Sequence, residues 1–246
     1  TIRGQLGELL QDGVRRQAGN NGFGAPLSFN AIAQIDVAKG PTPVLFGTSQ
    51  RNGGFVNLQS KLASITQPDS QFSFSAGRWD SYRTQIDTSR VLVENKSGIR
   101  LGYERIDNGD FYDFSSHRSD SLYTALRIVP DSASTWDINF EYYDVQFTDN
   151  AGINRPTQNL IDNGVYITGQ GVQPNGSLIP GAGAVISPTG QVVIDRSRVL
   201  TDPDNINSAT TYLIHSIYKR QLNEQTSLKN TTYYQHLERE EIAQNS

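Results

Sequence analysis

The sequence lacks cysteine and methionine entirely, and it has no long hydrophobic run. The absence of cysteine excludes disulfide bonds, thiolate metal sites and cysteine nucleophiles. No apolar stretch approaches the roughly 18 residues that a membrane-spanning helix needs, so a membrane role would have to depend on strands. The net charge of −4 provides no basic field for nucleic acid. Because the chain has no starting methionine, we expect it to be a fragment of a longer protein.

Residue patterns that indicate catalysis or metal binding are also scarce. The histidines, His117, His215 and His236, lie far apart, and no spacing of them indicates a metal site. Gly40 and Gly47 stand seven residues apart without the Gly-Lys-Ser/Thr ending of a phosphate-binding loop. No Ser/His/Asp spacing indicates a nucleophile. We therefore expect a protein that is not an enzyme and that holds no metal through its side chains.

From about residue 70 onward, apolar and polar residues alternate over long runs. Ile99 and Leu101, for example, share one face, while Arg100 and Glu104 share the other. Alternation with a period of two predicts antiparallel strands. We expect seven strands, over residues 71–79, 82–94, 98–108, 118–129, 134–148, 208–221 and 225–238.

The lengths of these strands and of their connections are informative. Several strands reach or exceed the roughly 9–11 residues of a tilted membrane-spanning strand, whereas ordinary strands average about 5–6. Short turns such as ENKSG, PDSAS and LNEQ alternate with longer connections, of which residues 149–207 are the longest. Transmembrane β-barrels show this asymmetry. A large soluble antiparallel sheet uses the same alternation, so the pattern alone leaves both interpretations open.

Glycine-containing motifs precede the strands in a fixed order. They are Arg3-Gly4, Asp12-Gly13-Val14, Lys39-Gly40-Pro41 followed by Leu45-Phe46-Gly47, and Gly53-Gly54-Phe55-Val56-Asn57. In order and spacing they resemble the plug domain of TonB-dependent outer-membrane receptors, especially the siderophore-receptor branch. The segment AGRWDSYRTQIDTSR is similar to the first barrel hairpin of that family, and GINRPTQNLIDNG to an outside loop of some members.

The resemblance implies an all-β membrane fold. Residues 1–66 would be the C-terminal part of a plug domain, and residues 67–246 the N-terminal portion of a transmembrane β-barrel of roughly 22 strands. About seven antiparallel strands of that barrel would be present, with a long extracellular loop at about 149–207. Seven strands cannot close such a barrel.

The resemblance also implies a function, namely TonB-dependent active transport across the outer membrane of a Gram-negative bacterium, with a ferric siderophore as the expected cargo. The implied partners are an extracellular ferric siderophore, outer-membrane lipid, and the TonB energy-coupling complex through a missing N-terminal segment. No cofactor is expected, and iron would be present only as chelated cargo. A glycan, cobalamin or another nutrient is an alternative cargo, and a soluble all-β binding or adhesion domain is an alternative class.

The expected roles of individual residues follow from the same resemblance. Arg3 and Lys39 would fix the plug by facing carboxylates of later barrel strands. The plug-motif residues would shape tight turns; they are Gly4, Asp12, Gly13, Gly40, Pro41, Gly47, Gly53, Gly54 and Asn57. Aromatic and cationic side chains suit a large, partly aromatic, anionic iron chelate. The expected ligand-binding residues are Phe23, Phe29, Arg51, Phe111, Tyr112 and His117.

Two further expectations concern the strands and the long loop. Polar residues on the inward face of the strands would line a water-filled lumen without a role in substrate binding; they are Arg100, Glu104, Arg127, Asp137 and Glu141. Within the long loop, a small hairpin is expected around Pro188-Thr189-Gly190.

Overall fold

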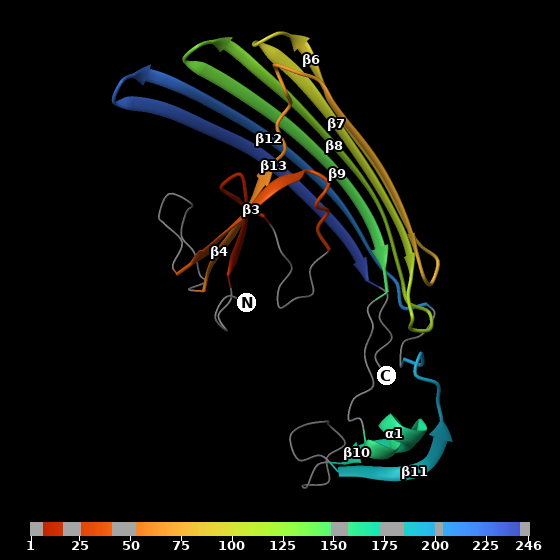
Figure 1. Cartoon of the computed structure of the whole chain (residues 1–246). Coiled ribbons are helices and arrows are strands. Elements are labelled where there is room, and N and C mark those ends of the chain that lie inside the picture. The colour runs from red at the N-terminus through yellow and green to blue at the C-terminus, as the bar shows by residue number, and fades with distance from the viewer. Residues whose placement is uncertain are drawn as a thin grey trace.

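The computed structural model describes residues 7–16, 26–40, 53–148, 157–172, 185–199 and 204–241. Its strands form a four-stranded sheet, a seven-stranded sheet and a two-stranded hairpin (Figure 1). Among these residues, no helix is long and apolar enough to cross a membrane.

The seven-stranded sheet, here called the wall, is antiparallel throughout, with the order β13-β12-β9-β8-β7-β6-β5. It is curved and open rather than closed (Figure 1). The seven expected strands are confirmed, and their ends differ from expectation by about three residues at most. The strands are β5 (Asp69–Gly77), β6 (Ser81–Val93), β7 (Ser97–Gly109), β8 (Ser116–Asp131), β9 (Ser134–Phe147), β12 (Asn207–Asn223) and β13 (Thr226–Glu241).

The outward face of the wall exposes large apolar side chains, whereas its inward face buries charged and polar residues beside apolar ones such as Tyr123 and Leu213. On β9, Trp136 is 39% exposed, whereas its neighbour Asp137 is only 3% exposed. On β7, Leu101 is exposed and Glu104 is buried. A soluble sheet buries its apolar face, while a membrane barrel turns that face outward to lipid and keeps a polar interior. This arrangement argues against the soluble binding domain.

The four-stranded sheet, here called the plug sheet, lies on the concave side of the wall (Figure 1). Its order is β2-β1-β4-β3, and β1 runs parallel to β4 while the other pairs are antiparallel. The strands are β1 (Glu8–Gln11), β2 (Val14–Arg15), β3 (Ile32–Lys39) and β4 (Gly54–Ser60). The expected boundary at residue 66 falls in the segment between β4 and β5, and it stays a prediction.

The turn between β1 and β2 explains one of the plug motifs. Asp12 and Gly13 both have positive φ, 51° and 84°. Glycine adopts this conformation at little cost, and Asp tolerates it better than most residues. The Asn57 side chain accepts a hydrogen bond from the Gly13 amide at 2.9 Å, and the Ser60 amide donates to Asp12 at 3.0 Å. The motif residues thus connect this turn to β4.

The wall has one end of short turns and one end of longer loops. Residues 94–96, 132–133 and 224–225 form the short turns. At the other end, the turn at 78–80 approaches the loop at 110–115, where the rings of Trp79 and Phe111 are 5.8 Å apart. The short connection at 78–80 therefore lies at the loop end of the wall.

Helix α1 (Gln158–Asn163) and strands β10 (Val165–Val172) and β11 (Val185–Val193) lie between β9 and β12. Helix α1 was not expected from the sequence; the Thr157 side chain caps its first turn. The hairpin expected in this loop exists, but its turn was misplaced. Pro188 and Gly190 lie inside β11, paired with Gly169 and Thr168 across a bulge. The β10–β11 connection lies outside the described residues.

Candidate functional site

The interface between the plug sheet and the wall combines polar contacts with a small apolar cluster of Ala31, Ile32, Tyr123 and Ala125. One group of buried polar contacts surrounds Glu141 on β9. Arg16, directly after β2, places Nη1 3.0 Å from Glu141 Oε2, and the two side chains are 4% and 8% exposed. Gln11 donates to the other Glu141 oxygen and accepts a hydrogen bond from Arg16. Charge-assisted hydrogen bonds of this kind are stronger than neutral ones. The three side chains form one network across the interface.

The neighbouring strand β12 contributes a second contact to the same plug turn. His215 Nδ1 lies 3.3 Å from Asp12 Oδ2, and Ser60 Oγ donates to that oxygen at 2.6 Å. Burial raises the pKa of the Asp12 carboxyl, but the hydrogen bonds from His215 and Ser60 together bring the pKa below its ordinary value of 3.8. Asp12 therefore carries its charge at neutral pH. These residues and the Glu141 network are together called the turn contact.

The segment after β4 makes a separate contact with β6 and β7, here called the linker contact. Asp87 on β6 accepts from Lys61 at 2.6 Å and pairs with Arg100 Nε at 2.7 Å. Arg100 also donates to the Leu62 carbonyl oxygen at 3.3 Å. One buried carboxylate thus joins a linker cation to a wall cation.

Backbone groups reinforce the linker contact. The Ser64 amide donates to Ser89 Oγ at 2.8 Å, and the Asn95 amide donates to the Ile65 carbonyl at 2.8 Å. A Cβ atom added to Gly98 would lie 1.9 Å from the Ser64 carbonyl oxygen. Glycine on β7 is therefore required for the linker backbone to approach this closely.

A third contact lies between these two, on β7 and β8. Asn30 is fully buried and donates to the Ser121 carbonyl at 3.3 Å, while Ser28 Oγ donates to Ser121 Oγ at 2.9 Å. Gly102 leaves room for the Asn30 side chain, because a Cβ atom there would lie 3.2 Å from Asn30 Oδ1.

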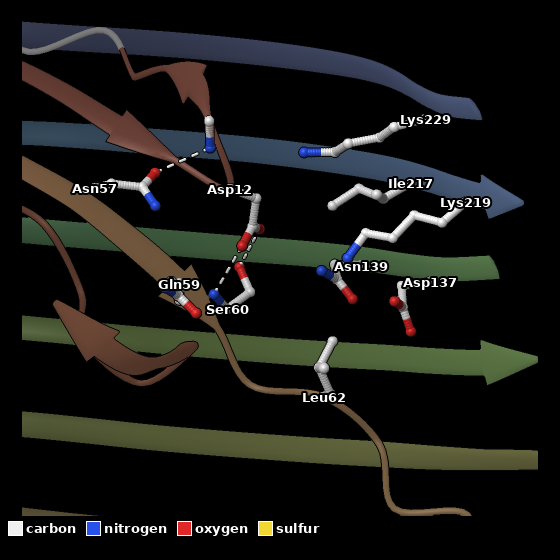
Figure 2. A pocket seen from close by; sticks show the side chains of 11 residues that line it. Asp12, Asn57, Gln59, Ser60, Leu62, Asp137, Asn139, Ile217, Lys219 and Lys229 are labelled. Carbon is white, nitrogen blue, oxygen red and sulfur yellow. Dashed lines mark hydrogen bonds between the residues drawn. The ribbon is translucent and has the colours of Figure 1, made fainter. Parts of the chain in front are cut away.

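A polar cavity of about 300 Å³ lies between the plug sheet and strands β9, β12 and β13 (Figure 2). Asp12 and Asn57 line it from the plug, and Asn139, Lys219 and Lys229 line it from the wall. The wall residues belong to the half of each strand nearer the short turns.

The expected ligand-binding residues are only partly brought together. Phe111 and Tyr112 are exposed in the loop after β7, with ring centroids 5.3 Å apart. His117 lies at the loop end of β8, and exposed Phe29 lies on the plug segment that contacts β8. Phe23 and Arg51 are outside the described residues. The ligand site therefore stays a prediction.

The expected plug fixation through Arg3 and Lys39 also stays a prediction. Arg3 is outside the described residues, and Lys39 is exposed at the end of β3. Of the motif glycines and proline, Gly4, Pro41 and Gly47 are outside the described residues. Gly40 and Gly54 have positive φ, and the Gly40 amide faces the Gly53 carbonyl at 3.4 Å.

The wall residues that contact the plug were not predicted from the sequence. Glu141 was assigned to a water-filled lumen, but it is buried against Arg16 and Gln11. Alternation placed it on the inward face, yet a period of two does not tell which inward residues meet the plug. The other four inward residues also form ion pairs: Arg100 with Asp87, Glu104 with Arg83, and Arg127 with Asp137. Within the described ranges, no group of three or more acidic, histidine or cysteine side chains could hold a metal ion.

Comparison with known proteins also finds similarity to siderophore receptors. No protein-family model matches the chain. The chain is 32% identical over 149 residues to the ferric-pyoverdine M114 receptor PbuA of Pseudomonas sp. (strain M114), a match that covers 58% of this chain and 17% of the receptor.

Several solved structures share the fold. The open form of the ferric-catecholate import receptor Fiu from E. coli K12 has a TM-score of 0.73 at 18% identity, covering 97% of this chain and 33% of that one. P. aeruginosa FpvA bound to a heterologous pyoverdine and iron has a TM-score of 0.69 at 16% identity, covering 94% of this chain and 27% of that one. The siderophore receptor PiuA from Acinetobacter baumannii has a TM-score of 0.69 at 15% identity, covering 94% of this chain and 29% of that one.

The chain therefore spans about a third or less of the length of the proteins it matches. Its plug sheet and its open wall of seven antiparallel strands superpose on siderophore receptors over most of the chain. The resemblance expected from the sequence motifs is confirmed: this chain resembles the siderophore-receptor branch of the TonB-dependent receptors, from the plug sheet through the first barrel strands.

Proposed function

We propose that the chain is part of an outer-membrane receptor that takes up a ferric siderophore with energy supplied through TonB. The observation that carries this proposal is the wall, with its apolar face exposed and its polar face closed by the plug sheet. The names of the relatives support the cargo class, because they include receptors for ferric pyoverdine and a ferric catecholate.

The chemistry of the interface suits a plug that must hold at rest and rearrange when energy is supplied. An apolar interface would resist opening by about 25 cal/mol per Å² of surface that returns to water. Separating polar partners costs less free energy, because hydrogen bonds to water replace the hydrogen bonds that break. A buried ion pair such as Arg16–Glu141 also adds little net stability when both partners become hydrated together. The interface can therefore be specific in position without being costly to open.

Transport then depends on two plug states with different affinities for the cargo. In this proposal the receptor has no resident cofactor and performs no catalysis, and iron enters only inside its chelator. The exposed apolar face contacts outer-membrane lipid, and TonB engages a segment outside this chain.

Uptake in cells tests the proposal. The full-length gene would be expressed in a Gram-negative strain that lacks its own pyoverdine and catecholate receptors, grown under iron limitation. We expect saturable uptake of radioactive iron from ferric pyoverdine or a ferric catecholate, and loss of that uptake when tonB is deleted. TonB-dependent uptake of cobalamin or a glycan, but not of iron, would show that the cargo is not a ferric siderophore. A full-length product that is soluble without detergent would refute the membrane assignment.

A further inference from the structure

The polar cavity of Figure 2 contains two lysines placed directly opposite each other. Lys219 on β12 and Lys229 on β13 are register partners, and both side chains extend along the cavity toward the plug residues Asp12 and Ser60. Like charges directly opposite on neighbouring strands are destabilising. In the part of the chain that the structure describes, neither lysine forms an ion pair with a carboxylate within 4.0 Å.

An unsatisfied amide lines the same cavity. Asn139 on β9 is only 3% exposed, and neither its Nδ2 nor its Oδ1 has a hydrogen-bond partner among the described residues. Buried polar groups without partners are rare and costly, so each one calls for a bound water, ion or ligand. The amide group therefore indicates a site whose occupant is a hydrogen-bonding molecule.

Each carboxylate at this cavity has a closer partner than either lysine. Asp137 pairs with Arg127 at 2.9 Å, and Asp12 is held by His215 and Ser60. Lys219 and Lys229 are exposed residues, and among the described residues no carboxylate lies within 4.0 Å of their ammonium groups. An anion between them would remove their mutual repulsion.

We propose that this cavity binds an anion with terminal oxygen atoms, a phosphate or a carboxylate, between the ammonium groups of Lys219 and Lys229. The Asn139 amide supplies a further N–H donor, and a volume of about 300 Å³ accommodates such an anion together with water molecules. The site goes beyond iron uptake, because it lies toward the short-turn end of the wall, away from the loops expected to meet the cargo.

Titration of the purified full-length receptor in detergent with inorganic phosphate, at constant ionic strength and without siderophore, tests the site. A parallel titration with succinate distinguishes a preference for phosphate from one for carboxylate. We expect saturable binding of at least one of the two in calorimetry. Because hydrogen bonds to charged groups contribute about 1.5–3 kcal/mol, Lys219→Gln and Lys229→Gln should each weaken binding by roughly tenfold or more.

Lys96→Gln is the matched control, because Lys96 lies in the short turn between β6 and β7 and does not line the cavity. Its affinity for the anion should equal that of the parent protein. Asn139→Asp provides a second variant, in which a carboxylate in the cavity should abolish anion binding; because Asn139 is buried, circular dichroism checks that the variant is folded.

The absence of saturable binding of both anions would overturn the proposal, as expected if the strand that continues the wall past β13 supplies a carboxylate to Lys229. Equal binding by the parent protein and both lysine variants would also overturn it. Because no siderophore is present, this result is independent of whether iron uptake is confirmed.

Discussion

Of the three contacts between the plug and the wall, the turn contact and the linker contact differ most in construction. The turn contact consists of side chains, centred on the buried Arg16–Glu141 pair, and it attaches a strand of only two residues. The linker contact combines an ion-pair cluster with backbone hydrogen bonds and a close approach at Gly98, in a segment covalently continuous with β5. The side-chain pairs of the turn contact can separate once the plug turn moves away from β9. The linker stays next to the wall because it is covalently continuous with β5. From this difference we expect the turn contact to be lost more readily than the linker contact.

The largest effect is expected from Glu141→Ala, which leaves the Arg16 charge buried without its partner. Loss of one member of a buried pair costs about 3–5 kcal/mol. Hydrogen exchange of the full-length receptor should show faster exchange at residues 8–16 and unchanged exchange at residues 61–65. Equal acceleration in both segments would contradict the separation of the two contacts. Asp107→Ala, which removes the exposed partner of Arg118, is the control and should cost less than about 1 kcal/mol.

Asp87→Asn tests the linker contact in the same way, with a smaller expected effect. The side chains of Lys61 and Arg100 are both 18% exposed, so water can partly replace the lost carboxylate. We expect a loss of about 2–3 kcal/mol. The acceleration of hydrogen exchange should now appear at residues 61–65 rather than at 8–16. The opposite distribution would show that the two contacts act as one.

Gly98→Ala tests the close approach of the linker backbone without changing any charge. Its Cβ atom would lie 1.9 Å from the Ser64 carbonyl oxygen, so the linker must shift. Overpacking of this kind costs about 1–3 kcal/mol, measured by denaturant unfolding. Gly77→Ala is the matched control, because its Cβ would be 3.6 Å from Ser81 Cβ, an ordinary contact. If the two alanine variants are equally stable, the linker does not require glycine at this position.

The smallest effect concerns pH and the Asp12 carboxyl. Because hydrogen bonds lower its pKa in the folded state, Asp12 stabilises the plug above the pKa of the unfolded chain. This contribution is lost as the pH falls through the lower, folded pKa. Asp12→Asn should therefore reduce the difference in plug stability between neutral and acidic solution, measured by hydrogen exchange at residues 8–16. An unchanged pH dependence would show that Asp12 does not contribute.

Much of the wall was predictable because a strand with one apolar and one polar face must alternate along its whole length. Strands over 98–108 and 134–148 were expected within a residue or two of β7 and β9. Helix α1 was not expected. The turn of the β10–β11 hairpin was misplaced because Pro188 and Gly190 have the residue types of a turn while lying inside a bulged strand.

The candidate site was less predictable than the strands. Asp12 and Gly13 were recognised as motif residues, but their contact with Asn57 and His215 joins segments far apart in the sequence. Glu141 was correctly predicted to lie on the inward face. It was expected to face water, but it contacts Arg16 and Gln11. Sequence alternation reports which side of a sheet a residue occupies, but it does not report which element packs there.

The sequence by itself determined the strand pattern, the division of each strand into two faces and the order of the plug motifs, because these depend on local periodicity and on residues near each other in the chain. Only the tertiary structure decided which polar side chains pair across the plug and wall. Ion pairs such as Arg16–Glu141 join residues more than a hundred positions apart, and the curvature of the wall brings those residues within reach.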